Sequence, residues 1–258
     1  MPDPLPSSPV DPRPFVAPCR ELPVTAPFGW VKAGWRDLKH APLQSLVYGA
    51  FFVAFSYLIS FVAYSWGSLP FFLGLLSGFI FLGPVLAVGL YAMSRQLQLG
   101  RRPSLGHALR EGIRHLGNEL VFTLMLLVVF LVWARAASMV HVFFPLEAHP
   151  ELRQLVGFLA IGSAAGSIFA LIIFSASAFS LPMIMDRSVD MVTAVVTSIH
   201  AVLRNKLAMV VWIGIIVSSV CVGFLTAFLG LGVLIPLLGY ATWHAYEETI
   251  DATDWPRH

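Results

Sequence analysis

The amino-acid sequence predicts an all-α fold, a polytopic membrane bundle of six transmembrane helices. Hydrophobic residues make up 57% of the 258 residues and charged residues only 12%, whereas soluble domains average ~25% charged residues. The mean hydropathy is +0.79. Six apolar stretches fill the chain between Leu43 and Ala245, and a helix needs ~20 apolar residues to cross the core of a bilayer.

The six stretches are predicted in order along the chain. The first carries no charge, and the short Gly67-Ser68 linker joins it to the second. The fourth is long enough to tilt or to extend past the bilayer. Residues 207–245 form two helices that turn at Gly230 and Gly232, because one helix of that length would be nearly twice as long as the bilayer core is thick. The predicted stretches are residues 43–66, 69–93, 116–140, 155–185, 207–228 and 231–244.

Lysine and arginine residues are concentrated in alternate connections, and such residues mark the cytoplasmic side of a membrane. The other connections hold only Arg153, beside Glu147 and Glu151. With six helices every basic connection falls on one side, which predicts that both termini are cytoplasmic. The basic residues are Lys32, Arg36 and Lys39, then Arg95, Arg101, Arg102, Arg110 and Arg114, then Arg187, Arg204 and Lys206.

The expected partner of the chain is the lipid bilayer. The net charge of +2 and the scattered basic residues do not indicate a nucleic-acid partner. The two cysteines, Cys19 and Cys221, suggest neither a disulfide framework nor a metal cluster. Other membrane-protein subunits, or a second copy of the chain, are further partners that the sequence leaves open.

The chain divides into a membrane domain at residues 29–250 and two tails. Residues 1–28 hold half of the prolines and no long hydrophobic run, a composition typical of a disordered arm. The arm is either an unstructured tail or a tether for a partner. It lacks the basic start and apolar core of a signal peptide. Residues 251–258 form a short cytoplasmic tail.

An internal repeat is predicted, with three units of one orientation. Each unit begins with an amphipathic or basic segment that precedes a helical hairpin, and the second helix of each hairpin carries a proline: Pro84, Pro182 or Pro236. Repeated units and broken helices occur in transporters. Duplication of a stable hairpin explains the same pattern without transport, and we favour that reading.

The segments before the hairpins suit helices that lie at the membrane interface. Trp30 and Trp35 alternate with basic residues that include Arg36, so the aromatic rings can insert among the lipids while the cations meet anionic headgroups. Trp243, near the end of the last stretch, fits an aromatic belt. These four residues are the predicted interfacial anchors.

Two charged residues of the third stretch are candidates for a functional role, because charges inside a bilayer are costly. Arg135 lies toward the outer end and either extends to the interface or pairs with an anionic group, such as an acidic residue of a neighbouring subunit. Glu119 lies at the cytoplasmic entry of the same helix. The two are ~24 Å apart on nearly opposite faces and cannot pair.

Four more polar candidates close the fourth and sixth stretches: Asp186 with Arg187, and His244 with Glu247. His244 and Glu247 have the i, i+3 spacing of a metal-binding pair, but no second pair exists on another stretch. No histidine lies in the middle of a stretch, which argues against haem ligation. No nucleotide, hydrolase or zinc-protease motif occurs either. We therefore expect no catalytic centre, no metal and no cofactor.

Small residues make the fourth stretch thin. Gly162 and Gly166 have a small-xxx-small spacing that lets helices approach closely. This predicts the fourth stretch either as the central helix of the bundle or as a contact between subunits.

Several of these motifs resemble the bacterial membrane family called domain of unknown function 2189. The resemblance is carried by the Gly-Trp-Arg-Asp-Leu run of residues 34–38, by residues 81–91, by Asp186-Arg187 with Asp190, and by residues 236–246. It covers roughly residues 29–250. It implies a bacterial inner-membrane protein without an established activity, and some members are labelled as a cytochrome c oxidase subunit.

Two functions remain open at this point. The first is a non-catalytic accessory, scaffold or assembly partner of a membrane complex, which fits the scarcity of buried ionisable groups. The second is a small transporter or channel with a pathway between the repeats. A cavity that converges on the three prolines would favour the second function.

Overall fold

The computed structural model describes residues 14–66, 83, 86–114, 116–143 and 152–257. In these residues the regular structure is helical, apart from two isolated bridges, so the predicted all-α class is confirmed. Residues 86–98 are also helical. The labelled helices are α1 Ala26–His40, α2 Pro42–Trp66, α4 Leu105–Arg114, α5 Leu116–Phe143, α6 Leu152–Ser177, α7 Ser180–Asp186, α8 Met191–Arg204, α9 Lys206–Leu225 and α10 Leu231–Thr249.

Three described segments are long and apolar enough to cross a membrane: Pro42–Val62, Val156–Asp186 and Lys206–Leu225. A shorter apolar segment, Leu120–Ala136, lies within α5. Most of the second predicted stretch falls outside the described residues. The membrane class is therefore supported, and the count of six helices stays a prediction.

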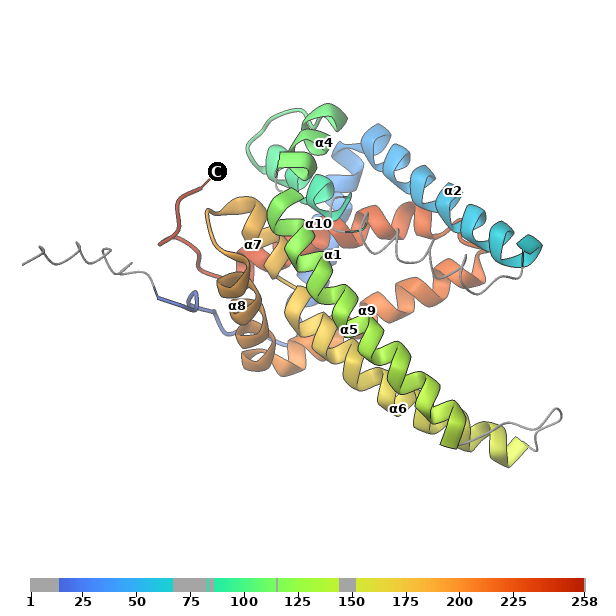
Figure 1. Ribbon diagram of the computed structural model, residues 1–258. Helices are drawn as coiled ribbons and strands as arrows, with labels where there is room; N and C mark the ends of the chain where they lie inside the picture. The colour runs from blue at the N-terminus through green and yellow to red at the C-terminus, as the bar shows by residue number, and fades with distance from the viewer. Residues whose placement is uncertain (1–13, 67–82, 84–85, 115, 144–151, 258) are drawn as a thin grey trace, which may run out of the picture.

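The helices form a compact head from which three arms extend (Figure 1). The head comprises α1, α4, α7, α8, the C-terminal half of α10, helical residues 86–98 and the chain segments 14–25 and 250–257. The arms are α2, the α5–α6 hairpin, and α9 with the first half of α10. Helices α5 and α6 lie side by side and point away from the head.

Helix α10 is the central helix of the head, where it packs on α1, α2, α7 and α9. It contributes Tyr240, Trp243 and Tyr246, each at most 2% exposed. Trp30 of α1 is 1% exposed and meets Trp212 of α9 edge to face, with ring centroids 5.5 Å apart. Full burial of such rings contributes roughly 1.5–3 kcal/mol each. Most of the fourth stretch, predicted as a possible centre of the bundle, lies in an arm as α6, and only its last part, α7, belongs to the head.

Close backbone contacts hold α10 in place. Pro236 has no N–H, so the carbonyl of Gly232 lacks its usual helical partner. Gly49 of α2 packs against this same carbonyl, and a Cβ at residue 49 would lie 1.8 Å from its oxygen. Gly34 of α1 packs in a similar way, since a Cβ there would lie 2.8 Å from the Leu237 oxygen. Only glycine permits α1 and α2 to approach α10 so closely.

The turn between α9 and α10 differs from the predicted one. The left-handed residues are Ala227 (φ 50°) and Phe228 (φ 68°), not the glycines at 230 and 232. Tyr57 of α2 stabilises this turn, because its hydroxyl donates to the Ala227 carbonyl at 2.7 Å and its ring packs edge to face on Phe228. Thr226 accepts a hydrogen bond from the Gly230 amide at 2.8 Å.

The fourth stretch is interrupted near its C-terminal end, where α6 ends and α7 begins. Pro182 supplies no N–H for the carbonyl of Ala178, four residues earlier. Ser198 of α8 pairs two other backbone groups at this junction: its hydroxyl accepts from the Phe179 amide at 3.1 Å and donates to the Ser175 carbonyl at 2.7 Å. The chain can therefore bend into the head without leaving these groups unpaired.

Both described chain ends pack on the head. Ala17 is 1% exposed, and its amide donates to Thr197 at 3.1 Å. Cys19 pairs with Ile250 through an isolated antiparallel bridge. The predicted disordered arm therefore ends earlier than residue 28, since residues 14–25 pack here and α1 starts at Ala26. Residues 1–13 lie outside the described chain.

A short helix precedes three of the long ones: α1 before α2, α4 before α5, and α8 before α9. A single residue, Ala41 or Asn205, separates two of these pairs. This order agrees with the amphipathic leading segments inferred from the sequence. The three-unit repeat stays a prediction, because the returning helix of its first unit is mostly outside the described residues.

The Gly49 contact gives a stability prediction. Gly49→Ala places a Cβ against backbone that cannot move aside, so we expect the unfolding free energy to fall by about 1–3 kcal/mol. Gly214→Ala in α9 is the matched control, because its Cβ meets no atom within 4 Å. The melting temperature in detergent checks both variants. A Gly49→Ala protein as stable as Gly214→Ala would contradict the contact.

Candidate functional site

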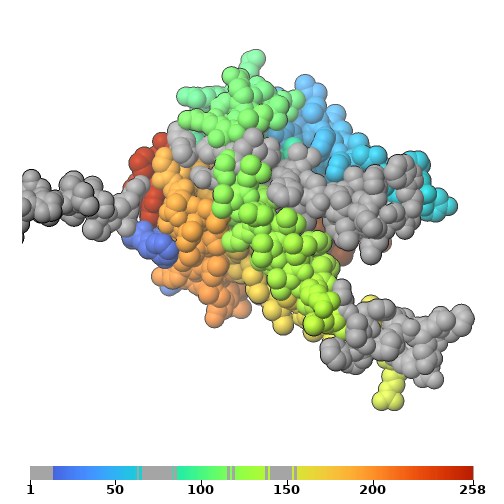
Figure 2. Space-filling view, in the orientation of Figure 1, coloured from blue at the N-terminus to red at the C-terminus, as the bar shows by residue number. Residues whose placement is uncertain are grey.

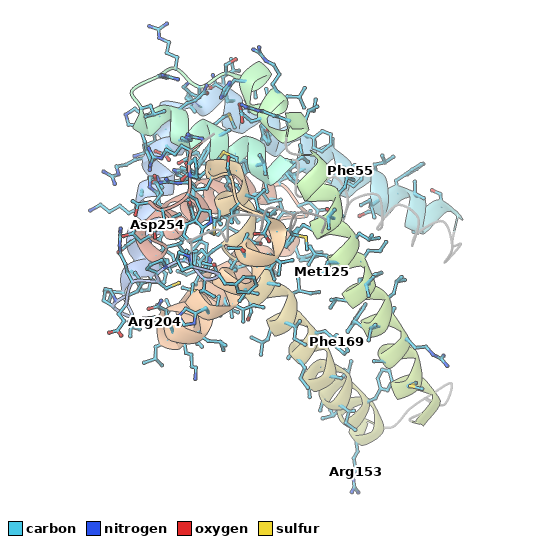
Figure 3. The ribbon with its side chains drawn as sticks, turned by 60° about the vertical axis from the view of Figure 1, so that its left-hand side comes forward. Phe55, Met125, Arg153, Phe169, Arg204 and Asp254 are labelled. Atoms are coloured by element: carbon cyan, nitrogen blue, oxygen red, sulfur yellow. The ribbon has the colours of Figure 1, made fainter. Side chains whose placement is uncertain are left out.

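Polar side chains from four helical segments converge inside the head. One group, the Asp37 cluster, comprises Asp37, Ser94, Gln98, His244 and Glu247. A second group, the Asp186 cluster, comprises Arg95, Asp186, Arg187, Tyr246 and Arg257. Figure 3 shows nitrogen and oxygen atoms gathered around the head, whereas the α5–α6 hairpin carries mostly carbon and ends near Arg153.

The Asp37 cluster is centred on one carboxylate oxygen. Oδ2 of Asp37 lies 2.8 Å from Nε2 of His244 and also accepts a hydrogen bond from the Ser94 hydroxyl. Asp37 is 9% exposed and Ser94 is fully buried. The two bonds join α1, helical residues 86–98 and α10 at a single point.

This arrangement contains the residue types of a hydrolase triad but not its geometry. In a triad the serine hydroxyl bonds to histidine, which removes its proton. Here Ser94 and His244 both bond to Asp37, so the imidazole is not placed to activate the hydroxyl. The cluster joins three helices through Asp37, and the Ser94 hydroxyl lacks the histidine contact of a triad.

Gln98 extends the Asp37 cluster. Its side-chain oxygen accepts from Trp243 Nε1 at 3.0 Å, and its nitrogen donates to Glu247 and lies 3.3 Å from His244 Nδ1. A similar bond joins α1 to α10 nearby, where Trp30 Nε1 donates to Glu248 at 2.6 Å. The buried indoles are thus satisfied by amide and carboxylate oxygens.

The Asp186 cluster surrounds a carboxylate that is 3% exposed. Oδ2 of Asp186 accepts from Arg187 Nε at 2.8 Å and from the Tyr246 hydroxyl at 3.1 Å. Oδ1 has no hydrogen bond in the described part of the chain, but Arg95 and Arg257 lie 3.7 and 3.8 Å away. Three guanidinium groups therefore compensate the charge of one buried carboxylate.

Burial raises the pKa of two neighbouring groups. It raises the pKa of the Glu247 carboxyl, against the opposing effects of the Gln98 hydrogen bond and the His244 charge. Burial, with the negative charge of Asp186, also raises the pKa of the Tyr246 hydroxyl. A cavity of about 140 Å³ opens beside both groups and is lined partly by Asp186 and Arg257. This cavity is the entry for solvent to the Asp186 cluster.

The described residues do not form a metal centre: no three His, Cys, Asp or Glu side chains among them converge on one point. His244 and Glu247, the pair with metal-like spacing, bond instead to Asp37 and Gln98. The two clusters consist of mutually bonded groups, an arrangement that positions helices.

The other predicted polar residues lie away from the head. Arg135 is exposed on α5. Glu119 lies on the same helix, and its side chain is outside the described part. Gly166 of α6 faces α5, because a Cβ there would lie 3.6 Å from Trp133 Nε1, whereas a Cβ at Gly162 would meet no atom within 4 Å. The structure does not bring these residues together with Asp186 or His244.

Two of the four predicted anchors are core residues. Trp30 and Trp243 are each 1% exposed, because their indoles bond across the head rather than to lipid headgroups. Trp35 is 42% exposed, and Lys39 lies 5.6 Å from its ring centroid. Arg36 is also exposed. The interfacial role therefore remains a proposal for Trp35 and Arg36 alone.

Sequence reasoning did not identify Ser94, Arg95, Gln98 and Arg257 as site residues. Asp37 was noted only within a motif. The signal for Asp37 was available in principle, because it is a polar residue within the amphipathic segment predicted before the first stretch. Arg257 gave no signal, since it reaches Asp186 from a chain end 71 positions away.

Comparison with known proteins supports the membrane assignment. A family model described as a predicted integral membrane protein, domain of unknown function 2189, matches residues 71–186. The matched part includes α4 to α7 and ends at Asp186, so the resemblance inferred from the sequence is confirmed there. Residues 34–38 and 236–246 lie outside the match. No curated protein and no solved structure matches the chain.

Removing the buried charge of Asp186 should destabilise the head. Asp186→Asn leaves the partly buried guanidinium groups of Arg95 and Arg187 without their carboxylate, and breaking a buried pair costs about 3–5 kcal/mol. Arg257→Gln is the control: its side chain is 58% exposed, and exposed pairs contribute about 0–1 kcal/mol. Denaturant unfolding followed by tryptophan fluorescence measures both. Equal losses in the two variants would refute a buried role for Asp186.

The raised pKa of Glu247 predicts a pH-dependent stability. A carboxyl whose pKa is higher in the folded state stabilises the fold below its unfolded pKa, and this contribution is lost as pH rises through the folded pKa. Glu247→Gln should therefore melt at a higher temperature than the wild type at pH 7. The difference should vanish below about pH 4.5, the ordinary value of the group. A variant less stable at pH 7 would show that the Glu247 charge is stabilising instead.

Proposed function

We propose that this chain is a non-catalytic accessory or scaffold protein that assembles with other subunits of a membrane complex. The head holds the arms at fixed positions on one side of the bilayer, and the α5–α6 hairpin meets a partner subunit within it. The observation that carries this proposal is the uncovered surface of the hairpin.

The hairpin receives little cover from the rest of the chain. The most apolar window of Val156–Asp186 has none of its residues buried, and Figure 2 shows α5 running along the outside of the molecule away from the head. An apolar surface of this kind must meet lipid or another protein. Lipid tails alone provide no reason for small side chains at that surface.

Small residues lie along the outward face of α6. Gly157, Ala160, Ala164 and Ser167 are all exposed, and their spacing of three or four residues puts them on one face of the helix. The opposite side, with Gly166, faces α5. Small outward side chains let a further helix approach closely, which is how membrane helices associate.

Arg135 provides a second support. It is exposed on the hairpin, where a charge in contact with lipid is costly. An acidic side chain of a partner subunit would neutralise it. The polar groups of the head, in contrast, bond to one another, so the head needs no substrate to complete it.

The head is the cytoplasmic part of this arrangement. It carries most of the basic residues and both described chain ends, and basic residues accumulate on the cytoplasmic side. The family resemblance suggests a bacterial inner membrane as the location. It also makes a respiratory oxidase the first complex to test, because some family members are labelled as a cytochrome c oxidase subunit.

Purification in mild detergent from the native membrane tests the proposal. We expect stoichiometric recovery of other membrane subunits by mass spectrometry, with haem absorption bands if the complex is an oxidase. Ala164→Leu, which enlarges the outward face, should lose these subunits. Ala170→Leu is the matched control, because residue 170 is exposed and about 120° away on the same helix.

A colourless, homogeneous particle without partners would overturn the proposal. Flux assays in liposomes would then test the transporter. Loss of the partners from both variants would place the contact elsewhere than on the small-residue face.

A further inference from the structure

We propose that the head contains a binding site for the phosphate of an anionic phospholipid. The site is a cavity of about 130 Å³ between α4, helical residues 86–98 and the end of α7. Its lining includes Arg95, Arg101, His107 and Arg114. This inference is independent of the subunit contact proposed for the hairpin.

The charge of the cavity favours an anion. Three guanidinium groups line it, and the carboxylate within it is Glu111, whose Oε1 lies 3.9 Å from both His107 Nε2 and Arg114 Nη1. Glu111 orients these two side chains along one edge of α4 and neutralises one charge. Arg95 also lies 3.7 Å from Asp186, so it is Arg101 that leaves the cavity with a net positive charge. Guanidinium groups bind phosphate oxygens in bidentate fashion.

The loop that supplies Arg101 is held in a defined conformation. Gly100 has a φ of 67°, its amide donates to Leu97, and the Arg101 amide donates to Gln96. These two bonds form the Schellman motif that ends a helix. The side chain of Gln96 also accepts from the Ser104 amide at 3.1 Å. The loop is thereby fixed over the cavity before any ligand binds.

The position of α4 places the cavity at the depth of lipid headgroups. Leu109 and Ile113 are 55% and 52% exposed, and Ala108 and Gly112 are buried against the protein. Helix α4 therefore presents half of its apolar side outward, just before the exposed apolar surface of α5 begins at Leu120. Such a helix lies in the membrane interface.

Polar and apolar surfaces at the cavity match the two ends of a phospholipid. Arg101 and Arg114 offer the cationic rim, while exposed Leu99 and buried Met185 offer carbon contacts. A soluble phosphate would use only the rim. Basic pockets beside membrane helices on the cytoplasmic side are known to bind anionic headgroups.

Native mass spectrometry of the full chain in detergent tests the site. Titration with phosphatidylglycerol should give saturable binding of a first lipid that phosphatidylcholine does not reproduce. Arg101→Gln with Arg114→Gln should weaken this binding roughly 30-fold, since each cation contributes about fivefold. Both side chains lie at the surface, so the double variant should fold and melt like the wild type.

A matched control separates this site from general attraction to a basic surface. Arg110→Gln with Lys32→Gln removes two exposed cations that do not line the cavity and should leave the affinity within about twofold. Equal weakening in both double variants, or equal binding of the two lipids, would overturn the proposal. Full displacement of the lipid by glycerol phosphate at comparable concentration would assign the site to a soluble phosphate and would also overturn it.

Discussion

The packing of α10 against two glycines determines the rest of the structure. Pro236 leaves the Gly232 carbonyl without its helical partner, and Gly49 lies against that carbonyl. Gly34 brings α1 equally close to the next turn of α10. Because these contacts join backbone to backbone, they leave almost no freedom in the angle between the helices. The side chains that follow on α10 therefore take fixed positions in the head.

The polar clusters depend on that placement. His244 reaches Asp37 only because α1 crosses α10 at Gly34, and Tyr246 reaches Asp186 only because α7 bends into the head near Pro182. Burial of polar groups is costly unless they are paired. The two clusters therefore stabilise one arrangement of the helices over other arrangements. This suits a head that holds the arms in a constant geometry.

Much of the fold could be predicted from the sequence, because apolar length and charge are local properties. Helix α9 was predicted within a few residues, and so were the starts of α5 and α10. The side-chain pairs within the head could not be predicted in this way, because residues such as Asp37 and His244 are 207 positions apart. Trp30 and Trp243 were assigned to the interface because aromatic residues near the ends of membrane helices usually lie there, whereas contacts from other helices bury them.

The turn before α10 is another feature that depends on a contact from a distant helix and could not be predicted from the local sequence. Gly230 and Gly232 were expected to mark the turn, yet its left-handed residues are Ala227 and Phe228, which Tyr57 from another helix supports. The glycines of this region instead make room for close packing. A single sequence does not distinguish a glycine needed for its φ angle from one needed for its missing side chain.

The central claim is that the arms cross the bilayer from a head that lies wholly on one side. Figure 3 shows Arg153 at the far end of the hairpin and Asp254 in the head. In a variant with Cys19→Ala and Cys221→Ala, a single cysteine at 153 or 254 can be labelled with a membrane-impermeant maleimide in intact cells and in inverted vesicles. The account predicts labelling of residue 153 from outside and of residue 254 from the cytoplasm. Labelling of both positions from the same side would show that the hairpin does not cross the membrane and would contradict the account.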